Sequence, residues 1–415
     1  MTSFYDTLEN RAPADREAAL LKALPAQVAH ARSHSPAFAD ILVGINPAEI
    51  TSRTALAGLP VTRKHELLER QQAQRSQTPF GGFATIGYGA QMPRVFASPG
   101  PIYEPEGIRR DYWRMARAMY AAGFRSGELI HNCFSYHFVP AGSMMESGAH
   151  AMGCTVFPGG TGQTEQQVQA MAELRPAGYI GTPSFLKLIV EKAHEMQMPL
   201  PSVTKALLSA EAFPPSLRDW FLERGIAGYQ CYGTADLGLI AYETEAREGL
   251  VLDENVIVEI VRPGTGDPVP EGEVGELVVT TLNTDYPLIR FGTGDLSAVL
   301  PGPCPTGRTN ARIKGWMGRA DQTTKVRGMF VHPGQVAAIA SRFPQVMRAR
   351  LVVSGEMAND QMVLQVETTE TSGGLATQLA EVTREITKLR GEVELVAPGT
   401  LPNDGKVIED ARSYR

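Results

Sequence analysis

The sequence predicts an α/β protein with a large N-terminal domain and a small α+β C-terminal domain. Between about 127 and 232, short apolar runs such as ELIHNCF and AGYIGTP alternate with helix-like segments, a βαβ rhythm typical of a mostly parallel sheet. Residues 249–300 consist of short strands separated by turns rich in Pro and Gly, which predicts antiparallel hairpins in a small β region. Residues 333–415 place two helix-like segments between strand-like runs, which predicts a separate α+β unit.

The helices expected from apolar periodicity lie in both parts of the chain. Residues 14–32 are rich in Ala and Leu at helical spacing, and Pro25 is expected to break that helix. The other expected helices are 165–175, 184–197, 334–342 and 374–390. We place the domain boundary near Ala320, so that the domains are 1–320 and 321–415.

Composition excludes several classes of protein. With 43% hydrophobic residues, 20% charged residues and a net charge of −6, the chain resembles an ordinary soluble globular protein. It has no basic patch for nucleic acid or an anionic membrane surface. Its N-terminus does not resemble a signal peptide, and no apolar run is long enough to span a bilayer. Four widely spaced cysteines are expected to be free thiols, which favours a cytoplasmic location.

Four separated segments carry a family resemblance. They are YGTAD at 232–236, LIRFGTGDL at 288–296, GRADQTTKVRG at 318–328 and LPNDGK at 401–406. In this order they resemble the signature motifs of the adenylate-forming (acyl-CoA synthetase) superfamily, and most closely its phenylacetate-CoA ligase branch. The similarity extends from about residue 97 to the end. The resemblance implies ATP, Mg²⁺ and coenzyme A as cofactors.

The YGTAD segment implies a nucleotide and metal site. Tyr232 would offer a ring face to the adenine, Gly233 would allow a tight turn, and Thr234 would lie beside them. Asp236 stands where the family usually has Glu, and it would hold Mg²⁺ against the phosphates as a catalytic and metal-binding residue. The alternative is a Tyr-Gly turn that leads into a helix capped by the Asp.

Two further segments complete the expected nucleotide site. Ala210, Glu211 and Ala212 match the family segment that lies along the adenine. Asp295 would accept hydrogen bonds from both ribose hydroxyls, an arrangement that a charged acceptor strengthens. The alternative for Asp295 is an ordinary Thr-Gly-Asp turn.

The C-terminal motifs imply a mobile domain that supplies catalytic groups. Arg319 would pair with the ribose or the α-phosphate. Asp321 marks the family's hinge, about which the C-terminal domain would swing between two catalytic poses. Gly328 matches the glycine that the thiol arm of coenzyme A passes. Lys406 would stabilise the carboxylate and α-phosphate during adenylation, whereas the alternative is a solvated terminal lysine.

One segment departs from the family pattern. Relatives carry a loop rich in Ser, Thr and Gly that ends in Lys-Pro and folds over the phosphates. The matching segment here is ASPGPIYEP, residues 97–105. Only Ser98 and Gly100 keep the expected donors, because both prolines lack an N–H group. Glu104 replaces the lysine and is expected to repel polyphosphate.

The stretch 131–153 resembles the family segment that lines the acyl pocket. Phe134, Tyr136, Phe138 and Val139 would form the walls of an apolar slot for a flat ring. The alternative is that they pack in the core behind a strand.

Two histidines in the same stretch have more than one interpretation. His131 and His137 suggest a ring that bears a hydroxyl, amino or second carboxyl group. Zinc binding by these histidines and neighbouring cysteines is another interpretation, although their spacing matches no standard pattern.

The resemblance therefore implies ATP-dependent activation of an aryl or arylacetic carboxylic acid through an acyl-adenylate, followed by transfer to coenzyme A. The expected partners are small molecules, with no nucleic acid and no membrane, and a homodimer is the assembly to test. One alternative is an adenylating enzyme whose acceptor is an amine or a carrier protein. Another is a non-catalytic nucleotide or acyl-CoA binding protein, which the altered loop at 97–105 suggests.

Overall fold

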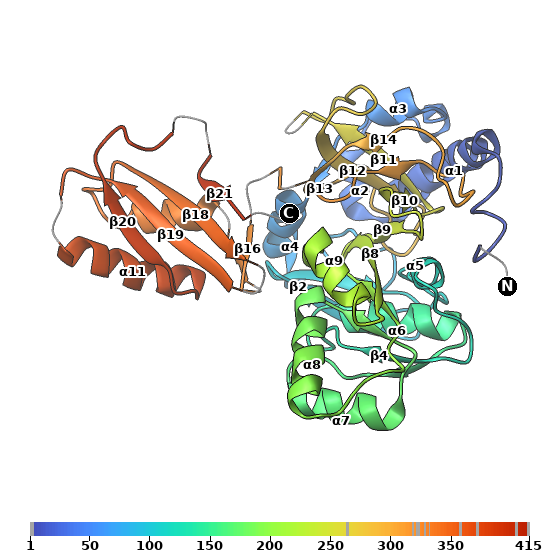
Figure 1. The fold of residues 1–415 in the computed structure, drawn as a ribbon. Helices are drawn as coiled ribbons and strands as arrows, with labels where there is room; N and C mark the ends of the chain where they lie inside the picture. Colours follow the sequence, from blue (N-terminus) through green and yellow to red (C-terminus); the bar gives the residue numbers. More distant parts are fainter. Residues whose placement is uncertain are drawn as a thin grey trace. The chain divides into compact units, whose positions relative to one another are not determined.

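A nine-stranded sheet organises the larger of the two compact units into which the chain divides, residues 1–317 and 318–415. The computed structural model describes residues 4–262, 265–317, 319–320, 324–327, 329–331, 333–356, 359–370, 373–402 and 406–412. In spatial order the strands of this sheet are β14 (Val299–Leu300), β15 (Arg312–Ile313), β10 (Leu250–Leu252), β9 (Gly238–Glu243), β8 (Ala227–Thr234), β7 (Lys205–Leu208), β6 (Gly178–Gly181), β4 (Leu129–Asn132) and β5 (Thr155–Phe157) (Figure 1).

The sheet changes from parallel to antiparallel at β8. Strands β5, β4, β6, β7 and β8 pair in parallel, whereas β8–β9, β9–β10, β10–β15 and β14–β15 pair antiparallel. The helix α5 (Ala116–Ala121) precedes β4, and the helices α6 (Ala141–Ala151), α7 (Thr164–Leu174), α8 (Pro183–Glu195) and α9 (Pro215–Leu222) connect the strands of the parallel part. The βαβ rhythm thus predicted the parallel part correctly, and ligands in such sheets bind at the carboxyl ends of the strands.

A second sheet and the N-terminal helices complete this unit. Its strands, in spatial order, are β1 (Thr62–Arg63), β13 (Phe291–Ser297), β12 (Gly275–Thr281) and β11 (Val256–Val261), and a separate hairpin is formed by β2 (Arg94–Ser98) and β3 (Ile102–Glu106). The helices are α1 (Pro13–His34), α2 (Pro36–Ile41), the 3₁₀ turn η1 (Pro47–Glu49), α3 (Arg53–Ala57) and α4 (Lys64–Gln74). The parallel pairing of β1 with β13 places the start of α4 beside the strand that carries Asp295.

The prediction that Pro25 breaks the first helix was wrong, because α1 is continuous from Pro13 to His34 with Pro25 inside it. A proline removes one backbone hydrogen bond from a helix interior. Packing on both sides of the proline offsets that loss, since Leu24 and Val28 are fully buried in one apolar core cluster.

The smaller unit is an α+β fold. Its four-stranded sheet has the order β20 (Glu392–Val396), β19 (Asn359–Glu367), β18 (Arg348–Glu356) and β21 (Ile408–Asp410), and a two-stranded sheet is formed by β16 (Thr324–Val326) and β17 (Met329–Val331). Its helices are α10 (Pro333–Ala340) and α11 (Gly373–Thr387). Leu351, Leu364 and Leu379 belong to its own apolar core, as expected for a unit with an independent fold.

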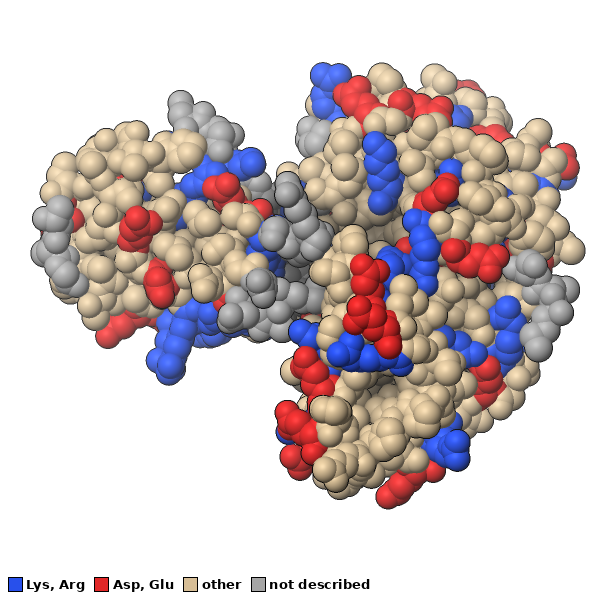
Figure 2. All heavy atoms as spheres, viewed as in Figure 1, with Lys and Arg blue, Asp and Glu red and all other residues tan. Residues whose placement is uncertain are grey.

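All four cysteines are free, as the sequence predicted, and the structure shows that all four are buried. Among the described residues, none of the helices combines the length and apolarity needed to span a membrane. Basic and acidic side chains are interspersed over the described part of the face shown in Figure 2.

Arg290 joins separate parts of the larger unit. Its guanidinium donates to Glu259 (Nε to Oε2, 3.0 Å) and to the carbonyls of Ala57 (2.8 Å), Leu59 (2.5 Å) and Gly266 (2.7 Å). Only 2% of Arg290 is exposed. A buried arginine that donates four such hydrogen bonds fixes the strand–loop arrangement from which β13 starts.

Replacing Arg290 by Met is expected to lower the free energy of unfolding by about 3–5 kcal/mol, because the buried Glu259 carboxylate loses its cation. Urea denaturation followed by circular dichroism measures the change. The exposed pair Lys187–Glu191 provides the control: Lys187→Met is expected to change stability by less than about 0.5 kcal/mol. Equal effects of the two substitutions would contradict this role of Arg290.

Candidate active site

The loops after β7 and β8 lie at one edge of the sheet, because these two strands are parallel neighbours. Residues 209–213 follow β7, and YGTAD spans the end of β8 and the residues after it. Ala210 and Glu211 are exposed, Ala212 is half-buried, and Ala210 has a positive φ of 67°. The Glu211 carboxylate accepts a hydrogen bond from the Ser184 hydroxyl (2.5 Å) at the start of α8.

Asp295 is the centre of a small polar cluster beside β8. Its Oδ2 accepts a hydrogen bond from the Tyr232 hydroxyl (2.7 Å), and its Oδ1 accepts one from the Trp316 indole Nε1 (3.1 Å). Asp295 is 7% exposed, and its backbone N–H donates to the Thr293 hydroxyl. Both carboxylate oxygens are therefore aligned to accept from two separate donors, which is the geometry that a pair of ribose hydroxyls requires.

Asp236 lies in a second polar cluster, where Lys64 compensates its charge. The Lys64 ammonium group is 2.9 Å from Asp236 Oδ2, and Lys64 is the first residue of α4. Asp236 is 3% exposed, and no described residue donates a hydrogen bond to its Oδ1. A buried carboxylate oxygen without a partner suits a hard cation that keeps its remaining ligands from phosphates and water. The Thr234 hydroxyl accepts from the Leu237 backbone N–H and holds the turn between the strand and Asp236.

The hairpin β2–β3 is the segment that departs from the family's phosphate loop. It is joined to α4 by the buried Gln71, whose side-chain amide donates to the Tyr103 carbonyl (2.9 Å) and accepts from the Tyr103 N–H (2.8 Å). At its tip, Arg75 donates to the Pro101 carbonyl (3.1 Å). On its other side, the Ala97 N–H donates to the Phe138 carbonyl (2.8 Å). The hairpin therefore contacts both the Lys64 helix and the predicted acyl-pocket segment.

Glu104 is turned into the hairpin and is not exposed. Its carboxyl group binds the Ser98 hydroxyl (2.5 Å) and accepts from the Ser98 N–H (3.2 Å). Burial, which is the larger cause, and the negative charge of the nearby Asp236 raise the pKa of Glu104 to about 8. At neutral pH this side chain is therefore largely protonated and repels polyphosphate less than the sequence suggested. It also occupies the Ser98 donors that relatives would offer to phosphate.

Replacing Glu104 by Gln is expected to change how stability depends on pH. The folded state keeps its proton up to about pH 8, whereas the unfolded carboxyl loses it near the ordinary glutamate pKa of 4.5. The stability of the native protein should thus fall as pH rises through that window. Glu104→Gln removes this loss and should gain up to roughly 4 kcal/mol relative to the native protein between about pH 5 and about pH 8.5. A stability difference that stays constant across urea titrations at these pH values would contradict the burial of an ionisable Glu104.

The predicted acyl-pocket residues differ in exposure. Phe134 is buried, whereas Tyr136 and Val139 are half-buried. Phe138 is 81% exposed and has a positive φ of 61°. These residues lie between β4 and α6. Phe134 is therefore part of the core, Tyr136 and Val139 remain partly accessible, and Phe138 lies at the surface.

The remaining predicted residues belong to the smaller unit. Arg319 is half-buried, and Lys406 is exposed, with its carbonyl accepting from Arg350 (3.5 Å). The predicted hinge Asp321 and the predicted coenzyme A glycine, Gly328, lie outside the described residues.

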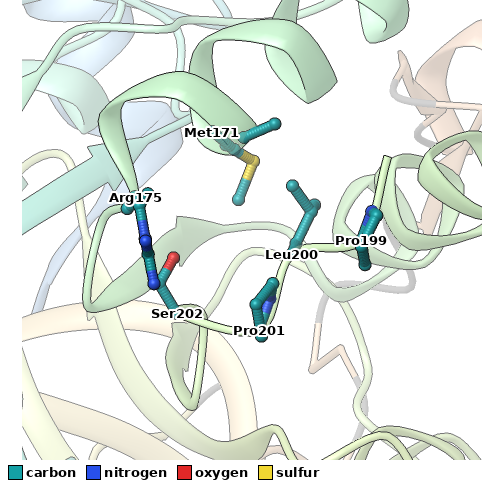
Figure 3. A pocket seen from close by; sticks show the side chains of 7 residues that line it. Met171, Arg175, Pro199, Leu200, Pro201 and Ser202 are labelled. Atoms are coloured by element: carbon teal, nitrogen blue, oxygen red, sulfur yellow. The ribbon is translucent and has the colours of Figure 1, made fainter. Parts of the chain in front are cut away.

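Two hollows of the larger unit are lined by residues outside these clusters. One of about 230 Å³ lies between the end of α7 and the loop after α8, where Met171, Arg175 and Leu200 line it (Figure 3). Another of about 190 Å³ is lined by Arg109, Tyr112 and neighbouring residues. No predicted site residue lines either hollow.

Sequence reasoning missed three residues that the structure brings to the site. Lys64 pairs with Asp236, Trp316 binds Asp295, and Glu146 binds Tyr136. Lys64 and Glu146 form side-chain contacts that no local pattern signals. For Trp316 one signal was available, because it lies just before the GRAD motif.

Comparisons with known proteins agree on one family. The family model described as AMP-binding enzyme matches residues 110–284. The phenylacetate-coenzyme A ligase of Thermus thermophilus is 32% identical over 361 residues, which cover 83% of this chain and 79% of that protein. The Escherichia coli enzyme of the same name is 29% identical and covers 88% and 86% of the two chains.

Solved structures extend the similarity to the fold of the whole chain. A 2-hydroxyisobutyryl-CoA ligase in complex with 2-HIB-AMP and CoA aligns with a TM-score of 0.82 and 25% identity, covering 100% of this chain and 93% of that chain. An open conformation of the same ligase aligns with a TM-score of 0.72.

Proposed function

Because the chain belongs to the phenylacetate-CoA ligase family of AMP-binding, adenylate-forming enzymes, we propose that it activates a carboxylic acid with ATP and transfers the acyl group to coenzyme A. A substrate carboxylate oxygen attacks the α-phosphorus and pyrophosphate leaves, which gives an acyl-adenylate. The coenzyme A thiol then loses its proton and attacks the acyl carbon, and AMP leaves. The observation that carries this proposal is the joint presence of the Asp295 cluster and the Asp236–Lys64 pair beside the carboxyl end of β8.

The Asp295 cluster is proposed to bind the ribose. Its two oxygens already accept hydrogen bonds from a phenol and an indole. The two ribose hydroxyls would replace these donors and make the same kind of hydrogen bond. Tyr232, released from that hydrogen bond, could then present its ring to the adenine. Gly233, Thr234 and the 210–212 loop are proposed to form the neighbouring wall.

The Asp236 cluster is proposed to hold the metal and the phosphates. Asp236 Oδ1 has no partner among the described residues and would ligate Mg²⁺, which neutralises phosphate charge when bound. Lys64 adds a cation near Glu104, the residue that stands where the family has its lysine. The Lys64–Asp236 pair therefore supports ATP chemistry in a chain whose loop carries Glu104 instead of the family's lysine.

The smaller unit is proposed to act as the mobile domain. Lys406 would stabilise charge on the α-phosphate and substrate carboxylate during adenylation. Arg319 would pair with ribose or phosphate, Asp321 would serve as the hinge, and Gly328 would let the thiol arm of coenzyme A pass. The exposure of Lys406 supports its role, because a group that must reach a bound substrate cannot be packed in the core of its own unit.

The proposed substrate is an aryl or arylacetic acid, bound near Phe134, Tyr136, Phe138 and Val139. The names of the relatives suggest phenylacetate and 2-hydroxyisobutyrate as the first acids to test. Buried free thiols support a cytoplasmic location. A homodimer is a further proposal that light scattering would test.

Acid-dependent exchange of labelled pyrophosphate into ATP tests the first step of the proposal. Exchange that requires both Mg²⁺ and an acid from the panel is the expected result. ATP binding without exchange for every acid would favour a nucleotide-binding protein without catalysis. The specific observation behind that second candidate is that Glu104 occupies the donors of Ser98.

A further inference from the structure

We infer that Glu146, oriented by Tyr136, determines substrate specificity by recognising a hydrogen-bond donor, a hydroxyl or a protonated amine, on the acid. The inference rests on the proposed function and deepens it by naming a chemical class of substrate. It concerns three residues that we call the acyl-pocket triad: Asn132, Tyr136 and Glu146.

The triad is a directed chain of hydrogen bonds. The Asn132 amide, at the end of β4, donates to the Tyr136 hydroxyl oxygen (2.8 Å) and to the Gly142 carbonyl (2.8 Å). The Tyr136 hydroxyl in turn donates to Glu146 Oε2 (2.9 Å). Because the phenol oxygen accepts from Asn132, its own proton is directed to Glu146. Burial, followed by this carboxylate, raises the pKa of Tyr136, so the phenol keeps its proton.

Close packing fixes the position of Tyr136. A Cβ atom at Gly142 would lie 2.9 Å from the Tyr136 ring and 2.8 Å from the Ser135 carbonyl oxygen. Glycine is therefore required in the first turn of α6 for the ring to lie against the helix. Asn132, which donates to the Tyr136 hydroxyl, is only 1% exposed and is itself fixed in the core. A group positioned in this way can discriminate between substrates, because little reorganisation accompanies binding.

Glu146 has unused capacity to accept hydrogen bonds. Tyr136 donates to its Oε2, and within the described ranges no Lys or Arg forms an ion pair with Glu146. Glu146 is half-buried on α6, so the carboxylate is partly shielded and yet accessible. An ionised carboxylate is an acceptor only. Its chemistry therefore selects a donor from the substrate, not another acceptor.

A second carboxylate strengthens this preference. Burial raises the pKa of Glu106, the nearby Arg94 lowers it, and the negative charge of Glu146 raises it. Arg94 is 3.2 Å from Glu106 and largely exposed on the hairpin. Glu106 and Glu146 therefore share a negative region. Such a region repels an acid with a second carboxylate and attracts one with a hydroxyl or ammonium group.

The hairpin connects this region with the proposed reaction centre. Glu104 and Glu106 are alternate residues of β3, so their side chains lie on the same face of the strand. Glu104 interacts with Asp236, and Glu106 interacts with Glu146. The Phe138 carbonyl of the pocket segment accepts from Ala97 of the same hairpin. The same hairpin therefore has residues near Asp236 and near Glu146 of the triad.

The test compares acids that differ by one donor group. Phenylacetate, 3- and 4-hydroxyphenylacetate, and 3- and 4-(aminomethyl)phenylacetate are assayed for pyrophosphate release, and 2-hydroxyisobutyrate is paired with pivalate. The native protein is expected to prefer at least one donor-bearing acid by roughly 10- to 100-fold in kcat/KM, the range for a hydrogen bond to a charged group. Glu146→Leu should reduce that preference to within about twofold of unity, while the rate with the parent acid stays within about threefold.

Three other variants separate charge from hydrogen bonding. Glu146→Gln keeps an acceptor and should retain part of the hydroxyl preference but lose the aminomethyl preference. Tyr136→Phe frees Glu146 Oε2 and should weaken the hydroxyl preference without abolishing it. Glu106→Gln is the matched control, because it removes one negative charge nearby without touching the triad, and it should weaken the hydroxyl preference far less than Glu146→Leu does.

Unchanged preferences in both Glu146 variants, or no preference in the native protein, would overturn the inference. Calorimetric binding of the same acid pairs to native protein and Glu146→Leu provides a readout that does not need turnover. If no acid gives pyrophosphate release, the proposed function fails. The inference is then tested by binding alone: it holds if Glu146→Leu removes the difference in affinity within each acid pair, and it is wrong if that difference remains.

Discussion

Lys406→Ala is expected to lower the rate of acyl-adenylate formation by about 10²- to 10³-fold, the usual cost of removing one group that stabilises transition-state charge. Thioester formation from a supplied acyl-adenylate and coenzyme A should stay within about threefold of the native rate, because that step needs no charge stabilisation on a departing pyrophosphate. Rapid-quench measurements of the two half-reactions, each started from its own substrates, provide the comparison.

The control for Lys406 is another exposed lysine of the same unit. Lys388 follows α11 and is exposed, so Lys388→Ala removes the same charge elsewhere on the surface and should leave both half-reactions unchanged. Equal loss of adenylation and thioester formation in Lys406→Ala would contradict the role proposed for this lysine. Such a result would indicate a general effect on the unit's fold.

Asp236→Asn is expected to reduce pyrophosphate release by about 10²-fold or more at limiting Mg²⁺, and raising the Mg²⁺ concentration should restore part of the activity. The amide keeps the shape of the side chain but is a weaker ligand for a hard cation. It also loses the ion pair to Lys64, which has a separation of 2.9 Å in the native protein. Activity measured across a Mg²⁺ titration, together with Mn²⁺ binding by electron paramagnetic resonance in the presence of ATP, separates metal affinity from folding.

Asp295→Asn provides the matched comparison for Asp236→Asn. It should raise the KM for ATP by roughly tenfold, since one ribose hydrogen bond to a charged acceptor is weakened, and its dependence on Mg²⁺ should match that of the native protein. If both variants shift the Mg²⁺ titration equally, Asp236 has no special role in holding the metal.

Local patterns in the sequence were enough to predict the main features of the architecture. The alternation of apolar runs and helices between 127 and 232 predicted β4–β8 and the helices between them. α7 and α8 begin and end within one or two residues of the predicted limits. The motif at 232–236 lies at the carboxyl end of β8, where a Gly-containing turn follows an apolar run.

The contacts that complete the site could not be predicted in the same way. Lys64 and Asp236 are separated by 172 positions in the sequence, and their pairing depends on the register of β1 against β13. Glu104 is buried because the β2–β3 hairpin brings it against Ser98. The presence of Glu in place of Lys therefore predicted a negative charge, whereas the raised pKa leaves this side chain largely protonated at neutral pH. The failure at Pro25 has the same origin, since packing outweighed a local preference.

The structure also changes what the altered loop means for catalysis. The sequence suggested that a glutamate facing polyphosphate would weaken ATP binding. In the structure, Glu104 is buried against Ser98, and Lys64 supplies a positive charge beside Asp236. The segment 97–105 is therefore a hairpin that contacts both α4 and the Phe138 carbonyl, and we propose that Lys64 and Asp236 recognise the phosphates.

The central claim, that this chain is an acid-CoA ligase, is tested most directly by mass spectrometry of the products formed with ATP, Mg²⁺, coenzyme A and the acid panel, alongside pyrophosphate release. The account predicts stoichiometric pyrophosphate and AMP together with an acyl-CoA. An acyl-adenylate that accumulates in the presence of coenzyme A and is converted only by an amine or a carrier protein would contradict the assigned acceptor. ATP binding without pyrophosphate release for any acid would contradict the enzyme itself.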